Sequence, residues 1–208
     1  MSRGRTVGLD FGFTPARSYD VQTMPQSSTA PVTWLDAQRM PDDGNRYEVI
    51  GGKLYVTPAP SIRHHRITRR LFRALDPLLV KAERGELFWA PVGVEFPVTG
   101  EGVEPDLMFV SAERRGIVGK DWIRGAPDLV AEILSPSTAR RDRSKKRDLY
   151  ERHGVPEYWI VDPDANAVDV WRFGEDPEHE RHTTTLPVRL GSERLGTIDL
   201  RDVFRPDS

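Results

Sequence analysis

The sequence predicts one domain of the α/β (α+β) class, in which a mixed β-sheet core is flanked by helices. Residues 128–134 are almost continuously apolar, which is typical of a strand buried on both faces beneath helices. Residues 62–81 carry apolar side chains at every fourth position, which is typical of an amphipathic helix packed on a sheet. Strand-like and helical segments then alternate along the chain, so helices are expected against a sheet.

The elements follow in order from local signals. Thr33 is expected to cap a short helix, with Asp36 at the capping-box position. Two β-prone runs joined at Gly51-Gly52 predict an additional N-terminal hairpin. Gly154, followed by Pro156, ends a helix expected over the preceding residues. Further strands are expected over residues 86–98, 104–110, 128–134, 157–161 and 167–173, a helix over 138–153, an exposed charged loop over 174–182, and closing C-terminal strands near 183–190 and 198–200.

Composition limits the chemistry that the chain can perform. Residues 1–31 mix Gly, Pro, Ser, Thr and Arg without periodicity, so a flexible tail is expected before a single domain over residues 32–208. The absence of cysteine excludes thiolate metal sites and favours the reducing cytoplasm. No apolar stretch approaches the roughly 20 residues of a membrane span. With a net charge of −2, any affinity for phosphate must come from local clusters of Arg and Lys.

Two carboxylates are candidates for the site. Alternation along residues 128–134 places Glu132 among apolar neighbours, where an ionised carboxylate needs a cation, a metal or hydrogen-bond donors. An ion pair with a nearby Lys or Arg would satisfy that need without any catalytic role. Asp128 lies about 13 Å from Glu132 along the strand at ~3.3 Å per residue, too far to share one ion. Asp106, on a neighbouring strand, is therefore the better partner.

Lys146 is the third candidate, because its helix starts within a few residues of the strand that carries Glu132. A lysine there can reach a bound phosphate or an attacking water. Asp142, four residues earlier, offers the simpler explanation of a surface ion pair. Two carboxylates and a lysine are the groups that metal-dependent phosphodiester cleavage requires, so the set predicts a nuclease.

Several blocks of sequence resemble the Uma-type putative restriction endonucleases of the PD-(D/E)XK nuclease superfamily, over about Trp34 to Phe204. The fold implied by this resemblance is restriction-endonuclease-like. The blocks are residues 46–54, 58–60 leading to His64, 104–107 and 127–138, followed by Lys146, Tyr150 and residues 154–163.

The resemblance implies a DNA endonuclease in which an attacking water is activated by Mg²⁺, with Mn²⁺ as a possible substitute. Asp106, Glu132 and the backbone carbonyl of Ile133 are the implied metal ligands. The superfamily lysine expected two residues after Glu132 is replaced by Leu134, and its role is assigned to Lys146.

Three further residues are possible supports for this chemistry. Glu48 matches an acidic residue that many superfamily members place on an early element, and it could equally be a surface charge. His64 faces the sheet, where a capped or hydrogen-bonded packing histidine is the more ordinary interpretation than a catalytic one. Tyr150 belongs to the matching blocks.

Basic residues cluster on both expected helices, and a solvated face explains such runs as well as a phosphate track does. The candidate substrate-binding residues are Arg66, Arg70, Arg140 and Arg143. Cleavage of both strands favours a homodimer. The alternative functions are a catalytically inactive nuclease fold that binds nucleic acid or a protein partner, and a different hydrolase such as a glycosidase, for which no sugar cleft is indicated.

Overall fold

The computed structural model describes residues 30–174 and 177–206 of the 208-residue chain. From Pro31 onward, the described residues form one compact unit. The tail expected over residues 1–31 lies almost wholly outside the described residues. In the described part of the chain, no helix is both long enough and apolar enough to span a membrane.

A six-stranded mixed sheet forms the core, in the order β11-β10-β9-β8-β6-β3. Its members are β3 (Gly85–Trp89), β6 (Leu107–Ser111), β8 (Leu129–Ile133), β9 (Glu157–Asp162), β10 (Ala167–Arg172) and β11 (Glu178–His182). Strand β8 runs parallel to β9, and the other neighbouring strands are antiparallel. The helical segment between β8 and β9 makes the crossover that a parallel pair needs.

A second sheet has the order β2-β1-β5-β4-β7. Its strands are β1 (Arg46–Ile50), β2 (Lys53–Thr57), β4 (Val94–Phe96), β5 (Glu101–Val103) and β7 (Ile123–Arg124). Strands β1 and β2 form the expected hairpin, and Gly51 and Gly52 have positive φ angles of 59° and 69°. Strands β12 (Thr185–Leu190) and β13 (Glu193–Asp199) form a separate antiparallel pair.

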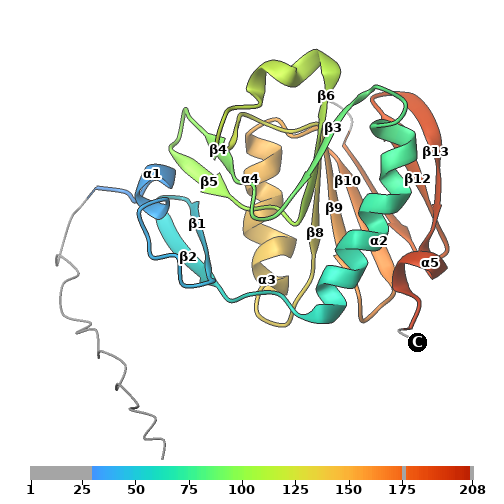
Figure 1. Cartoon of the computed structure of the whole chain (residues 1–208), viewed down its shortest axis with the longest axis horizontal. Coiled ribbons are helices and arrows are strands. Elements are labelled where there is room, and N and C mark those ends of the chain that lie inside the picture. Colours follow the sequence, from blue (N-terminus) through green and yellow to red (C-terminus); the bar gives the residue numbers. More distant parts are fainter. Residues whose placement is uncertain (1–29, 175–176, 207–208) are drawn as a thin grey trace, which may run out of the picture. The chain divides into compact units, whose positions relative to one another are not determined.

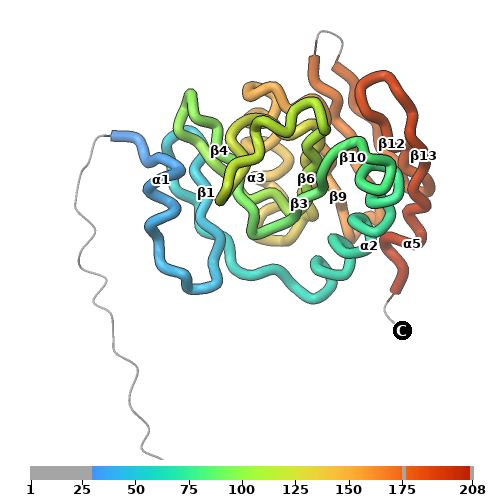
Figure 2. Tube along the Cα trace, turned by 45° about the horizontal axis from the view of Figure 1, so that its top comes forward, coloured from blue at the N-terminus to red at the C-terminus, as the bar shows by residue number. Residues whose placement is uncertain are grey.

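The helices cover both faces of the six-stranded sheet (Figure 1). Helix α2 (Ile62–Leu79) packs its apolar stripe on one face, together with β12, β13 and α5 (Leu200–Phe204). Helix α4 (Arg147–Arg152) packs on the other face, against residues from both sheets. The view in Figure 2 shows β12 and β13 alongside α2. The short elements are α1 (Trp34–Ala37), the 3₁₀ helix η1 (Ala112–Ile117), α3 (Ala139–Arg141) and the π-helical turn η2 (Asp142–Lys146).

The expected fold class is confirmed, and several local predictions hold. Thr33 and Asp36 form the capping box of α1. Strand β8 is buried throughout, with residues 129, 131 and 133 on the α2 face and residue 130 on the α4 face.

Two local predictions were wrong. The expected exposed loop over 174–182 contains β11, because its charged residues pair with those of β10: Arg181 binds Asp169 at 2.7 Å, and Arg172 binds Glu178 at 3.1 Å. The expected strand over 86–98 is two strands in different sheets, β3 and β4, separated by a turn.

Candidate active site

The candidate site lies where the chain crosses from one sheet to the other. Strand β5 ends at Val103, and residues 104–106 lead directly into β6. Because Leu107 pairs with Ala131 in the antiparallel ladder, Asp106 lies beside the C-terminal end of β8. A cavity of about 220 Å³ opens there. Its ionisable lining residues are Arg46, Glu48, His64, Asp106, Glu132, Arg141, Asp142 and Lys146.

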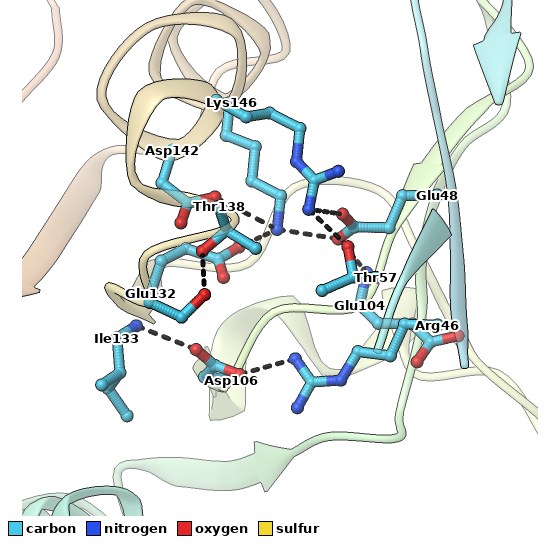
Figure 3. Close-up of polar contacts among 12 residues, drawn as sticks. Arg46, Glu48, Thr57, Glu104, Asp106, Glu132, Ile133, Thr138, Asp142 and Lys146 are labelled. Carbon is cyan, nitrogen blue, oxygen red and sulfur yellow. Dashed lines mark hydrogen bonds and ion pairs between the residues drawn. The ribbon is translucent and has the colours of Figure 1, made fainter. Parts of the chain in front are cut away.

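Asp106 is buried and has donors on both carboxylate oxygens. His64 Nε2 lies 2.9 Å from Oδ2, and the backbone N–H of Ile133 donates to the same oxygen at 2.8 Å. Arg46 Nη1 donates to Oδ1 at 2.6 Å, from β1 of the other sheet (Figure 3). Burial alone would raise the pKa of Asp106, but the hydrogen bonds and charges of His64 and Arg46 hold it at about 2. Asp106 is therefore ionised at neutral pH.

Glu132 and Lys146 form a buried ion pair. Lys146 Nζ donates to Glu132 Oε1 at 2.9 Å, and Tyr150 donates its hydroxyl proton to the same oxygen at 2.6 Å. The lysine is also 2.7 Å from Glu48 Oε1 and 3.8 Å from Asp142 Oδ1. Its side chain is only 3% exposed. Lys146 therefore does not form the simple surface pair with Asp142, because two other carboxylates lie closer to its ammonium group.

Glu48 joins the hairpin to the helical segment. Its side chain is buried, with Oε1 facing Lys146 and Oε2 lying 3.3 Å from Arg141 Nη2. The backbone N–H of Glu104 donates to Oε1 at 3.1 Å. Arg141 also donates to Thr57 Oγ1 at 2.5 Å. Glu48 is therefore a buried member of the site and not a charge on the surface of the strand.

The π-helical turn η2 places the lysine. Asp142 and Lys146 are the two residues of this turn that are buried, whereas Arg143, Ser144 and Lys145 are exposed. Lys145 donates to the Tyr55 hydroxyl at 2.5 Å, outside the carboxylate cluster. π-Turns within helices are rare and are often found at functional sites. The turn therefore directs Lys146, and not its neighbour, toward Glu132.

The electrostatics of the site are dominated by carboxylates. Burial raises the pKa of Glu132 to about 8; Lys146 opposes the shift and the neighbouring carboxylates add to it. Burial also raises the pKa of Glu104 to about 7, with a further contribution from Glu48. Burial would lower the pKa of Lys146, but the charges of Glu132, Glu48 and Asp142 raise it. Lys146 is therefore protonated at neutral pH.

The donor set fits a hard divalent cation. Four carboxyl side chains line the cavity beside three permanently cationic side chains. Glu48 Oε2 and Asp142 Oδ1 are buried and accept no hydrogen bond within the described part of the chain. Carboxylate oxygens are the ligands that Mg²⁺ prefers.

The carboxylates do not form a complete metal cage by themselves. No group of three or more His, Asp or Glu side chains in the described ranges is arranged to hold a metal ion. The set implied for this site combines two side chains, Asp106 and Glu132, with a backbone carbonyl. A metal ion held by this set would need only two carboxylate side chains from the protein.

The predicted basic residues lie outside this cavity. Arg143 pairs with Asp162 at 2.6 Å and Asp169 at 3.1 Å, and Arg70 donates to the backbone carbonyl of Arg205 at 2.7 Å. Arg66 lines a different cavity, near α5, and Arg140 is exposed on α3. Arg140 and Arg143 are both exposed on the helical segment that borders the site.

Asp128 lies at the opposite end of β8 from Glu132. It accepts the backbone N–H of Ser111 at 2.7 Å and pairs with Arg114 at 3.3 Å. The strand therefore separates Asp128 from Glu132, as its length predicted.

Three site residues were not singled out from the sequence, namely Arg46, Glu104 and Arg141, and Asp142 was considered only as a surface partner of Lys146. Arg46 had a usable signal, because it lies two residues before Glu48 on the same strand and therefore shares its face. Arg141 and Asp142 needed the position of the π-turn, for which the sequence gives no signal.

The mixed sheet with helices on both faces, and acidic residues at the junction of β6 and β8, define a restriction-endonuclease-like fold. Residues 34–201 match the Uma2 family, described as "putative restriction endonuclease", so the chain belongs to that family. The family resemblance read from the sequence is thereby confirmed, and the chain is a member of a nuclease family.

Two similar proteins extend this comparison. A crystal structure of a putative nuclease belonging to DUF820 from Anabaena variabilis superposes with a TM-score of 0.67 at 22% identity, covering 84% of this chain and 98% of that chain. That likeness shows the shared fold. An uncharacterized protein of Synechocystis sp., sll1609, is 27% identical over 126 residues, which are 60% of this chain and 71% of the relative.

Proposed function

We propose that the chain is a Mg²⁺-dependent endonuclease that hydrolyses phosphodiester bonds of DNA. The observation that carries this proposal is the convergence of Asp106, Glu132 and Lys146 from three separate elements on one cavity. Membership in the Uma2 family supports the same reaction class.

Asp106, Glu132 and the carbonyl of Ile133 would hold Mg²⁺, or Mn²⁺ in its place. The metal would supply Lewis-acid stabilisation of the charge that develops on the phosphate. Asp106 is already ionised and held by three donors. Glu132 is held by Lys146 and Tyr150. Its pKa is raised mainly by burial and further by the neighbouring carboxylates, and a bound cation would favour its ionised form.

Lys146 acts in this proposal as a fixed positive charge. Because its pKa is raised, its ammonium keeps its proton at neutral pH and can donate hydrogen bonds to an attacking water or a phosphate oxygen. A proton-accepting role would need a lowered pKa instead. Glu48 positions the ammonium at 2.7 Å, so it is a supporting residue in this reaction.

The experiment is a cleavage assay on supercoiled, linear and single-stranded DNA with Mg²⁺ or Mn²⁺. Wild-type protein is expected to nick or cut at least one substrate, and Glu132→Ala is expected to lose that activity while remaining folded. Glu113→Gln is a matched control, because Glu113 is exposed and lies outside the site cavity. Undiminished cleavage by Glu132→Ala contradicts the site, and no cleavage by wild type across these substrates contradicts the nuclease proposal.

An inactive nuclease fold is the alternative function, and the same proteins distinguish it. DNA binding by wild type without cleavage under any of these conditions favours that alternative. Cleavage of both strands at one position would support the proposed homodimer, which analytical ultracentrifugation tests directly.

A further inference from the structure

The three donors that hold Asp106 differ in how freely they can move. The N–H of Ile133 belongs to the backbone of buried strand β8, and His64 is 9% exposed on α2. Arg46 comes from the other sheet, on a longer side chain, and is 18% exposed. Of these donors, Arg46 can leave Asp106 with the least change to the fold.

Arg46 also occupies the carboxylate oxygen that a cation would need. Oδ2 accepts from both His64 and Ile133, whereas the described contacts of Oδ1 involve Arg46 alone. A divalent cation on Oδ1 would compete with the guanidinium for that oxygen and would be repelled by its charge. Arg46 therefore neutralises Asp106 at the place where the metal is proposed to bind.

The Arg46 side chain borders a cavity that also holds other cationic groups. Arg46 lines the same space of about 220 Å³ as Lys146 and Arg141. A phosphodiester that entered this space would present two non-bridging oxygens, which match the fork of an arginine. An arginine released from Asp106 thus has an anionic partner within its reach once substrate is bound.

We infer that Arg46 is a metal-displaced positioning residue: it holds Asp106 in the metal-free protein, yields Oδ1 when a divalent cation binds, and then contacts the substrate phosphate. The inference rests on the proposed function, since it requires a cation at Asp106. Arg46 lies on β1 of the second sheet and contributes to the site through its contact with Asp106.

The test is calorimetric titration of the metal-free protein with MnCl₂ in the absence of DNA. Arg46→Gln removes the competing charge and is expected to bind Mn²⁺ about tenfold more tightly than wild type. Arg46→Lys keeps the charge and is expected to stay within about threefold of wild type. Arg140→Gln removes an exposed charge from the neighbouring helical segment and should also stay within about threefold. Mn²⁺ binding that is lost in Glu132→Ala is assigned to this site and is called Glu132-dependent.

Equal or weaker Mn²⁺ binding by folded Arg46→Gln, or an equal gain in Arg140→Gln, would overturn the inference and leave the proposed function standing. Absence of Glu132-dependent binding in both wild type and Arg46→Gln would overturn the proposed metal site itself.

A second measurement uses the wild-type chain and does not depend on the folding of a variant. The Arg46 Nε–Hε resonance, assigned by its loss in Arg46→Lys, is expected to shift during a Mg²⁺ titration as the Asp106 contact is released. An unchanged resonance while Glu132-dependent metal binding reaches saturation would refute the displacement.

Discussion

In the metal-free protein, the stability of Glu132→Gln relative to wild type should increase as pH rises. Burial raises the pKa of Glu132 from 4.5 to about 8 in the folded protein. A carboxyl group whose folded pKa is raised costs stability when pH exceeds its unfolded pKa, and the cost grows until pH reaches the folded pKa. Between pH 4.5 and pH 7 this cost reaches about 3 kcal/mol at 1.36 kcal/mol per pH unit.

The glutamine keeps the shape of the side chain and an acceptor oxygen for Lys146 or Tyr150, but it does not titrate. We therefore expect the difference in unfolding free energy between Glu132→Gln and wild type to rise by about 3 kcal/mol in favour of the variant between pH 4.5 and pH 7. Urea unfolding in EDTA at a series of pH values measures this difference. Other titrating groups are common to both proteins and largely cancel.

Glu113→Gln serves as the control, because its exposed side chain should give a nearly constant difference from wild type across this range. A difference for Glu132→Gln that is independent of pH, or that moves in favour of wild type as pH rises, would refute the reasoning. Added Mg²⁺ should stabilise wild type at pH 7 and should stabilise Glu132→Gln much less, since the variant lacks a proposed ligand charge.

Three further predictions concern other contacts. Tyr150→Phe leaves Glu132 without its 2.6 Å hydroxyl donor, and we expect a loss of about 1–3 kcal/mol in urea unfolding, with no loss arguing against that hydrogen bond. Glu101 has a pKa of about 2, because hydrogen bonds from His153, the Gly51 N–H and Arg152 outweigh burial. Glu101→Gln should therefore be less stable than wild type at neutral pH, and this difference in stability should shrink as pH falls from about 4.5 toward 2 in acid unfolding. Gly102→Ala would place a Cβ 2.4 Å from the ring of Trp34 and should cost about 1–3 kcal/mol in thermal unfolding, whereas Gly116→Ala meets no neighbouring atom within 4 Å and should cost less.

Much of the fold could be predicted because hydrophobic periodicity marks it directly. The four-residue spacing along α2 and the apolar run of β8 each identified an element and its buried faces. The loop over 174–182 was mispredicted because β11 is stabilised by cross-strand charge pairs with β10. Such a strand has no apolar alternation to reveal it.

The site was predictable to the extent that its residues lie on regular strands. Alternation put Glu132 on one face of β8, and the strand length separated it from Asp128. Arg46 escaped notice because its partner, Asp106, is 60 residues away and lies in the connection between the two sheets. Arg143 seemed available for substrate because the sequence does not show that β9 and β10 supply Asp162 and Asp169 to it.

The ionic residues at the junction between the two sheets also connect separate elements of the fold. Arg46 ties β1 to the start of β6, and Glu48 ties the same strand to Lys146 and Arg141 of the helical segment. Removing one partner of such buried pairs typically costs about 3–5 kcal/mol. A descendant that lost its ability to cut DNA would therefore still be selected to keep these charges, in order to fold. The presence of Arg46 and Glu48 in a relative is for that reason weak proof that the relative is an active enzyme.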